Sequence, residues 1–114
     1  MTISRIKPGA WNSQAVIHNG LICLSGLVPD DKSVGMKEQT AQVLAKIDAA
    51  LDAAGSNKRR ILSAVVYLAD MSQKDAMNEA WMDWMDPSCP PARAAVGVEL
   101  TPGTLVEIMV QAVQ

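Results

Sequence analysis

Two apolar segments constrain the fold of this chain most strongly. Segment 61–69 is apolar at nearly every position and rich in β-branched residues, which predicts a strand buried on both faces. Strict alternation would place Ile61, Val65 and Tyr67 on one of its faces, and Leu62, Ala64, Val66 and Leu68 on the other. Segment 105–113 alternates as well, and one side of it is wholly apolar: Val106, Ile108, Val110 and Ala112. The two segments predict a sheet with a large apolar area.

The remaining elements follow from turn residues and from changes of period. Asn19-Gly20 joins segments 14–18 and 21–25, and this dipeptide favours the tight turn of a β-hairpin. From residue 36 to 54 the apolar residues recur at helical spacing, and Gly55 stands where a left-handed cap would end the helix. Together these predict a hairpin followed by a long amphipathic helix.

A second helix is expected after residue 71. Ser72 and Asp75 have the spacing of a capping box, and Pro87 follows the end of the pattern. The apolar stripe of this helix comprises Met77, Ala80, Trp81 and Trp84. Strands are predicted at 93–100 and 105–113, and a short strand near 4–6 precedes the hairpin. The expected fold class is α+β, with a β-sheet and two helices.

Two helices can cover only one face of such a sheet. The opposite face would expose a larger apolar patch than a soluble monomer usually carries. We therefore expect this face to pack against copies of itself in a closed, symmetric oligomer. Glu107 would then lie near a boundary between subunits.

Composition limits the classes of function. With 114 residues the chain is expected to form one domain, residues 1–114. The net charge of −2 argues against nucleic acid as the main partner, and the cluster 58–60 is interpreted as a solvated turn. The two cysteines have no metal-binding spacing. Without a long apolar segment, neither a signal peptide nor a membrane span is expected, and the predicted location is the cytoplasm.

Two charged residues stand inside apolar strands. Arg93 opens the run 94–98, and Glu107 lies at the centre of the last strand. A buried charge without a partner is too costly to keep, so Arg93 needs an anion. That anion is either a ligand or a carboxylate of the protein, such as Glu107 or Glu99. The residues alone leave both alternatives open, because the planar fork of an arginine can hold either carboxylate bidentately.

Three short motifs resemble one known family. These are Pro91-Ala92-Arg93 at the head of a strand, Val106-Glu107-Ile108 in the last strand and Leu24-Ser25-Gly26 at the end of the hairpin. Together with the order of elements, they resemble the Rid family, also called YjgF-like proteins, whose name stands for reactive intermediate deaminase. Segments 39–40, 47–48 and 77–81 are similar too, so the resemblance spans nearly the whole chain.

The resemblance implies a chorismate-mutase-like fold: a mixed sheet with two helices on one face, assembled as a homotrimer through the other face, with ligand clefts between neighbouring subunits. In active members, the arginine matching Arg93 holds the carboxylate of a 2-imino or 2-enamino acid. The glutamate matching Glu107 positions the water that hydrolyses it to a 2-oxo acid and ammonia. Ser25 and Gly26 are implied to line the same cleft. No metal or cofactor is expected.

The chain also departs from the family pattern. Ala95 stands where many members have a cysteine, and Asn12 stands where a tyrosine is common, with Trp11 as a possible substitute. We predict these three positions, with Ser25 and Gly26, as substrate-binding. A second hypothesis stays open, a trimeric binding module that holds small carboxylate metabolites without turnover. The acidic charge argues against a nuclease, an activity attributed to some relatives.

Overall fold

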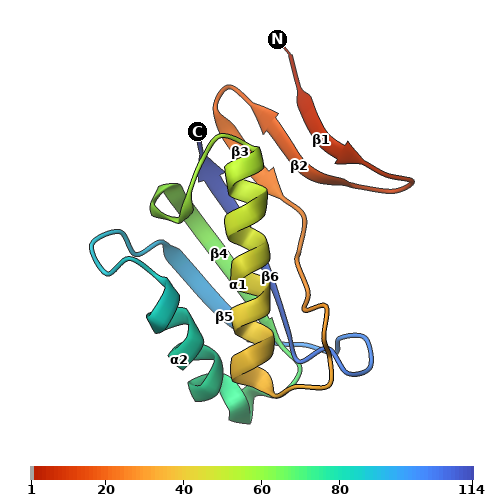
Figure 1. Cartoon of the computed structure of the whole chain (residues 1–114), viewed down its shortest axis with the longest axis vertical. Coiled ribbons are helices and arrows are strands. Elements are labelled where there is room, and N and C mark those ends of the chain that lie inside the picture. The colour runs from red at the N-terminus through yellow and green to blue at the C-terminus, as the bar shows by residue number, and fades with distance from the viewer. Residues whose placement is uncertain (1) are drawn as a thin grey trace.

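A mixed sheet of six strands carries two helices on one of its faces (Figure 1). The computed structural model describes residues 2–114. The strands are β1 (Ser4–Pro8), β2 (Ser13–His18), β3 (Leu21–Leu24), β4 (Ile61–Leu68), β5 (Ala92–Gly97) and β6 (Val106–Val113). The helices are α1 (Met36–Ala53) and α2 (Lys74–Trp84), with short 3-10 turns η1 (Lys58–Arg60) and η2 (Met71–Gln73).

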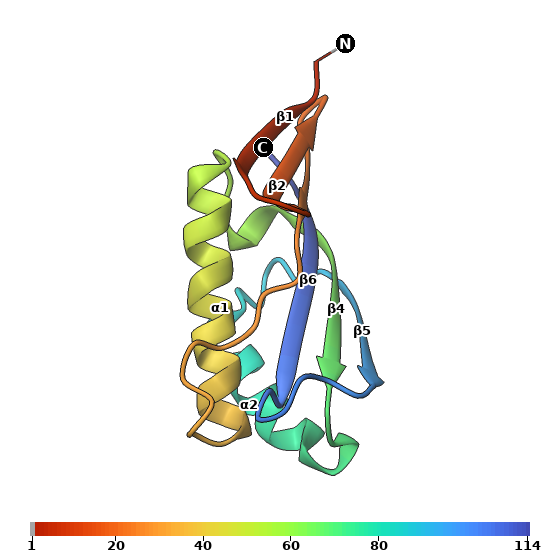
Figure 2. The ribbon, with the colours of Figure 1, turned by 90° about the vertical axis from the view of Figure 1, so that its right-hand side faces the viewer.

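The strands lie in the order β1-β2-β3-β6-β4-β5. β5 pairs with β4 in parallel and forms one edge of the sheet, whereas the other neighbours are antiparallel. Seen from the side, both helices lie on one face of the sheet, and the opposite face has no helix over it (Figure 2). We call these two faces the helix face and the open face. The predicted α+β class, the mixed sheet and the placement of both helices on one face are confirmed.

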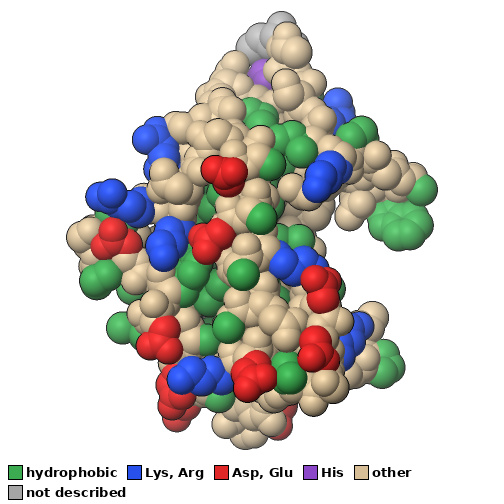
Figure 3. Space-filling model, viewed as in Figure 1, with side chains coloured by type: hydrophobic (Ala, Val, Ile, Leu, Met, Phe, Trp, Pro, Cys, Tyr) green, Lys and Arg blue, Asp and Glu red, His purple; other side chains and the backbone are tan. Residues whose placement is uncertain are grey.

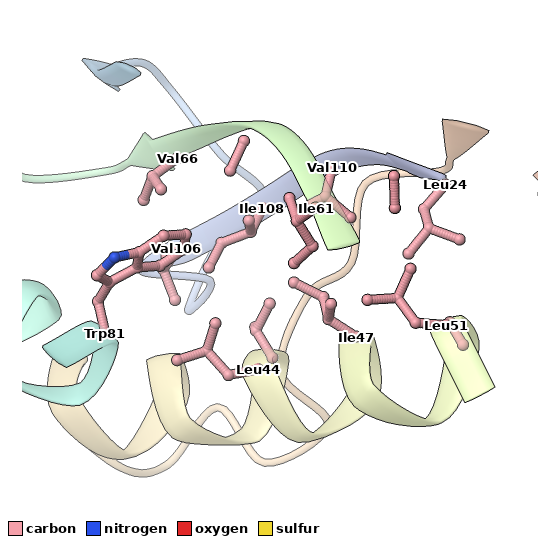
Figure 4. Packing of buried hydrophobic residues seen from close by; sticks show 14 of the residues in the cluster. Leu24, Leu44, Ile47, Leu51, Ile61, Val66, Trp81, Val106, Ile108 and Val110 are labelled. Atoms are coloured by element: carbon pink, nitrogen blue, oxygen red, sulfur yellow. The ribbon is translucent and has the colours of Figure 1, made fainter. Parts of the chain in front are cut away.

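The hairpin and the first helix agree with the sequence prediction. Asn19 and Gly20 both have positive φ angles, 51° and 79°, as the two-residue hairpin turn requires. Gly55 has φ 80°, and its amide and the next one donate to the carbonyls of Asp52 and Leu51, which ends α1. The predicted apolar stripe of α1 is buried, and Leu44, Ile47 and Leu51 pack against Val106, Ile108 and Val110 of β6 (Figure 4).

One polar residue inside this core was not predicted. The Gln39 side chain is fully buried, and its Nε2 donates to the carbonyls of Gly103, Val34 and Lys32, at 3.0, 3.1 and 3.4 Å. Its Oε1 accepts from the amide of Leu105 at 2.9 Å. The side chain thus ties α1 to the loop before it and to the loop that enters β6.

The predicted faces of segment 61–69 are wrong at its first two residues. The pairing of β4 with β6 shifts register between Ile61 and Ser63. Because of this bulge, Ile61 faces the core, as Ala64 does, and Leu62 is half exposed. Strict alternation would have placed Leu62, and not Ile61, on the same face as Ala64. The rest of β4 alternates as expected, with Val66 and Leu68 buried.

The capping box predicted at Ser72 is also wrong. The carboxylate of Asp70 accepts hydrogen bonds from the amide and hydroxyl of Ser72. Asp70, and not Ser72, thus caps the short η2 turn. α2 then begins at Lys74 with no side-chain cap. Asp70 takes this role because an aspartate two residues before an amide can form the turn by itself. Within α2, Met77, Ala80 and Trp81 are buried as predicted, whereas Trp84 is only half-buried.

The two faces of the molecule differ in chemistry. Lys, Arg, Asp and Glu side chains are interspersed over the helix face (Figure 3). The open face bears exposed apolar side chains at Val96 and Met109, each 40 % accessible. In residues 2–114, no helix combines the length and the apolar character needed to cross a membrane.

The basic cluster 58–60 forms the turn η1, with Arg59 and Arg60 exposed as predicted, and its side chains also contact neighbouring parts of the chain. Lys58 donates to the carbonyl of Trp84 at 2.6 Å, Arg59 pairs with Asp86 at 3.2 Å, and Arg60 donates to the carbonyl of Gln114. The cluster therefore ties η1 to the end of α2 and to the last residue.

Candidate functional site

The Arg93 side chain lies on the helix face of edge strand β5. Arg93 pairs with Ala64 of β4, whose side chain is in the core, and directly paired residues point to the same side of a sheet. Its Nη2 donates to Oδ1 of Asn78 at 2.8 Å, and its Cζ lies 5.0 Å from the ring centre of Trp81. Both partners come from α2. An amide and an indole thus fix the direction of the guanidinium without neutralising its charge.

The carboxylates proposed as partners of Arg93 do not pair with it. In the described part of the chain, neither Glu107 nor Glu99 forms an ion pair with this guanidinium. Partial burial lowers the pKa of Arg93 below its usual value, because desolvation disfavours the charged form. An arginine nonetheless stays protonated at neutral pH. The half-buried fork therefore remains a cation with N–H groups free to bind an anion.

Glu107 lies on the open face of the same sheet. It pairs with Tyr67 of β4, which in turn pairs with Val96 of β5. The carboxylate of Glu107 rests against the backbone of Gly26, where any Cβ would overlap it. Glycine at position 26 thus leaves room for this carboxylate, and its φ angle is not in the positive region. Across residues 2–114 no hydrogen bond or ion pair occupies this carboxylate, so its oxygens are available to accept hydrogen bonds.

Ser25 connects the end of the hairpin to this region. Its hydroxyl donates to the carbonyl of Ser13 at 2.5 Å, and its amide donates to the carbonyl of Gln14 at 3.0 Å. Because its proton is donated to this carbonyl, the hydroxyl can only accept hydrogen bonds from a ligand. These contacts are compatible with the role that the resemblance implies for Ser25, which is to line the cleft.

A cavity of about 370 Å³ opens on the side of the sheet that carries Met109. Ser25, Asn12, Arg5 and Met109 are among the residues that line it. This volume lies within the usual range for sites of small molecules. Trp11 does not line the cavity; it stands at the turn between β1 and β2 and is 89 % accessible.

A larger cavity of about 620 Å³ lies between α1 and α2, but none of the predicted site residues lines it. Most of its charged side chains already contact other groups of the protein. Lys37 pairs with Glu79 and Asp83, and the Trp84 ring nitrogen donates to Asp48 at 3.0 Å. Size alone therefore does not make it the better candidate.

The predicted site residues form two groups in one protomer. Asn12, Ser25, Gly26 and Glu107 belong to the cavity or to its neighbourhood on the open face. Arg93 and Ala95 point to the helix face, since Ala95 pairs with the buried Val66. Arg93 and Glu107 thus lie on opposite faces of one sheet, and one protomer by itself does not bring them together.

Sequence reasoning missed three residues near the site. Asn78 and Trp81 hold Arg93, and their spacing of three residues along a helix places them on the same side, which was a usable signal. Arg5 lines the cavity from β1, and nothing in its neighbourhood in the sequence pointed to the site.

Comparison with protein families matches residues 2–114 to the family described as Endoribonuclease L-PSP. The chain belongs to this family. It includes proteins named YjgF and RutC, and the resemblance to Rid proteins is thereby confirmed. A RutC family protein of Haemophilus influenzae is 44% identical over 112 residues, which cover 96% of this chain and 97% of that protein. The RutC family protein YoaB of Escherichia coli is 43% identical and covers 98% of both chains.

Solved structures of the YjgF family share the fold. A YjgF-family protein of Neisseria meningitidis superposes with a TM-score of 0.97 at 43% identity, covering 100% of this chain and 96% of that one. The Rid family protein YyfA of Yersinia pestis, itself of unknown function, gives a TM-score of 0.85 at 32% identity over 94% of this chain and 90% of that one. The fold of this chain is therefore that of the YjgF family.

Proposed function

We propose that the protein is a hydrolytic deaminase of small 2-imino or 2-enamino acids, with Arg93 as the carboxylate anchor. The observation that carries this proposal is the environment of the guanidinium. It is half-buried and directed by Asn78 and Trp81, and no carboxylate in residues 2–114 pairs with it. A partly desolvated cation that is oriented but not neutralised is suited to hold the carboxylate of a ligand.

The proposed site is shared between protomers of a homotrimer. Arg93 and Glu107 lie on opposite faces of one sheet, so a single substrate meets both only if they come from different copies. The exposed apolar side chains of the open face, among them Val96 and Met109, favour such packing. In this arrangement Arg93 of one protomer, with Ala95 beside it, faces the cavity and Glu107 of its neighbour. The exposed Trp11 would then contact the adjoining subunit at the rim of the cleft.

The chemistry requires few groups. With the substrate carboxylate held by Arg93, the imine carbon is fixed in position, which removes much of the orientational entropy from the barrier. A water attacks this carbon while Glu107 accepts a proton from it, and the imine nitrogen is protonated. Glu107 then returns its proton to the amine nitrogen of the tetrahedral carbinolamine, whose C–N bond breaks to release ammonia. The hydroxyl proton passes to solvent, and the 2-oxo acid forms.

The release of ammonia from freshly generated 2-iminopropanoate tests this function. We expect the native protein to accelerate this release. Arg93→Ala should reduce kcat/KM about a hundredfold, because it removes hydrogen bonds to a charged group that stabilise the bound substrate by about 3 kcal/mol. Arg93→Lys is expected to be strongly impaired too, because an ammonium cannot replace the fork. If a folded Arg93→Ala variant kept the native rate, the anchor role would be wrong.

The alternative is a binding module of the same architecture. The position of Ala95, which adds no polar group beside Arg93, favours it. Calorimetric titration with simple 2-oxo acids separates the two functions. Binding that depends on Arg93, without any acceleration of ammonia release, would establish the module and refute the deaminase.

A further inference from the structure

Arg5 brings a second cation to the cavity. The register of the sheet aligns Arg5 with Val16, Val16 with Cys23 and Cys23 with Gln111, across four strands. Directly paired residues point to the same side, so this row lies on one face. Val16 and Cys23 line the same cavity as Arg5. The guanidinium therefore stands at the β1 end of the cavity that Ser25 and Met109 line at the β3–β6 end.

The cavity offers no anion to this cation. Among the described residues, Arg5 makes no ion pair, and no aspartate or glutamate lines the cavity. The other polar groups there are neutral, such as the Asn12 amide and the Ser25 hydroxyl. A concave surface with one unpaired positive charge attracts a negatively charged ligand group.

Arg5 and Glu107 lie at different ends of this region. Glu107 adjoins Gly26, directly after Ser25, whereas β1 is two strands from β3. With strands about 4.8 Å apart, the backbones of β1 and β3 are separated by roughly 10 Å. A ligand that reacts beside Glu107 would reach Arg5 only with a group at its far end.

We infer that Arg5 is a specificity-determining residue and that the preferred substrates are 2-imino acids with a second, distal carboxylate. This inference rests on the proposed function: Arg93 holds the carboxylate next to the imine, and Arg5 holds the one at the other end. A carboxylate suits the site better than a phosphate group, because one guanidinium balances a single negative charge.

Two 2-oxo acids of equal length provide the test, since neither contains the reactive imine. 2-Oxohexanedioate carries the distal carboxylate, and 2-oxohexanoate has a methyl group in its place. The native protein is expected to bind the diacid about tenfold more tightly in calorimetry, which corresponds to about 1.4 kcal/mol. Arg5→Gln should abolish this preference, so that the two acids bind with similar affinity. Arg5→Lys should keep part of it.

Lys7 supplies a matched control on the same strand. Its positive φ of 49° interrupts the strand geometry, and its side chain lines a different cavity, beside Ala49 and Ala53 of α1. Lys7→Gln makes the same change of charge but should keep the preference for the diacid. Equal losses in both variants would show a general effect of net charge and overturn the inference.

The remaining outcomes separate this inference from the proposed function. If the monoacid binds in an Arg93-dependent manner and the diacid binds no better, the role of Arg5 is refuted and the proposed function stands. If neither acid binds, the proposed function fails and this inference fails with it. If Arg5→Gln disrupts the oligomer in light scattering, Arg5 is an interface residue, and the inference is again refuted.

Discussion

Replacing Asn78 by aspartate tests the role of Arg93 with almost no change of shape. The amide oxygen of Asn78 accepts from Arg93 at 2.8 Å, and a carboxylate can accept in the same place. The variant therefore keeps the hydrogen bond and adds a negative charge. Arg93 would then be paired within the protein, and a ligand carboxylate would have to compete for it.

The size of the effect follows from this distance. Two unit charges about 4 Å apart interact by about 4 kcal/mol at an effective dielectric constant of 20. Both side chains are only half-buried, and solvent screening together with the desolvation of the new carboxylate reduces this to about 1–3 kcal/mol. Since about 1.4 kcal/mol is a factor of ten, Asn78→Asp should weaken the binding of a 2-oxo acid by about ten- to a hundredfold.

The assay is calorimetric titration with 2-oxopropanoate, accompanied by thermal unfolding. Asn78→Asp should unfold at the native temperature or slightly above it, because the new ion pair stabilises the folded state. Asn78→Ala is the control: it frees Arg93 without neutralising it, so its affinity should fall only a few-fold. Native affinity in a folded Asn78→Asp variant would refute the claim that Arg93 binds the ligand.

Three further predictions concern the glycine at the site, the core and the response to acid. Gly26→Ala should displace the carboxylate of Glu107 and abolish ammonia release while the protein stays folded. Gly35→Ala is the control: a side chain at this position meets open space, so ammonia release should continue at the native rate. Equal activity of the two variants would contradict the packing argument. Gln39→Leu leaves several backbone groups without a hydrogen-bond partner, so it should lower the free energy of unfolding by about 2–4 kcal/mol in urea titration. A loss below about 0.5 kcal/mol would show that water satisfies these groups in place of the Gln39 amide. Two hydrogen bonds hold the pKa of Asp70 below its ordinary value, so its contribution to stability is present above about pH 4 and is lost as the pH falls through the lowered value. The stability difference between the native protein and Asp70→Ala should therefore shrink from pH 7 to pH 3, and a constant difference would contradict this.

Local patterns in the sequence predicted most of the fold. The Asn19-Gly20 turn, the helix that ends before Gly55 and the last strand were all recognisable, because each depends on residues close together in the chain. The prediction was wrong where two neighbouring residues could form the same capping hydrogen bonds. Ser72 and Asp70 both could cap the turn before α2, and only the structure shows that Asp70 does.

Longer-range relations were beyond the sequence. The bulge near Ile61 depends on how β4 pairs with β6, and a shift of one residue exchanges the faces of a strand. Buried Gln39 escaped notice because periodicity arguments count only apolar residues.

Sequence reasoning proposed Arg93 and Glu107 as site residues, but it did not predict where they lie relative to each other. Arg93 and Glu107 were both singled out, yet their relative placement depends on β4, which lies between their strands. Arg93 pairs with Ala64 and Glu107 with Tyr67, and these two positions face opposite sides of β4. No feature of the chain near either residue reveals this relation.

Subunit complementation tests the shared site most directly. Arg93→Ala and Glu107→Gln are each expected to be strongly impaired in ammonia release from 2-iminopropanoate. After the two variants are unfolded together in equal amounts and refolded, random assembly gives about a quarter of the clefts an intact Arg93 and an intact Glu107 from different protomers. We predict recovery of about a quarter of the native rate. If mixed oligomers form, as shown by mass spectrometry, and the rate stays at that of the separate variants, a site shared between protomers is contradicted.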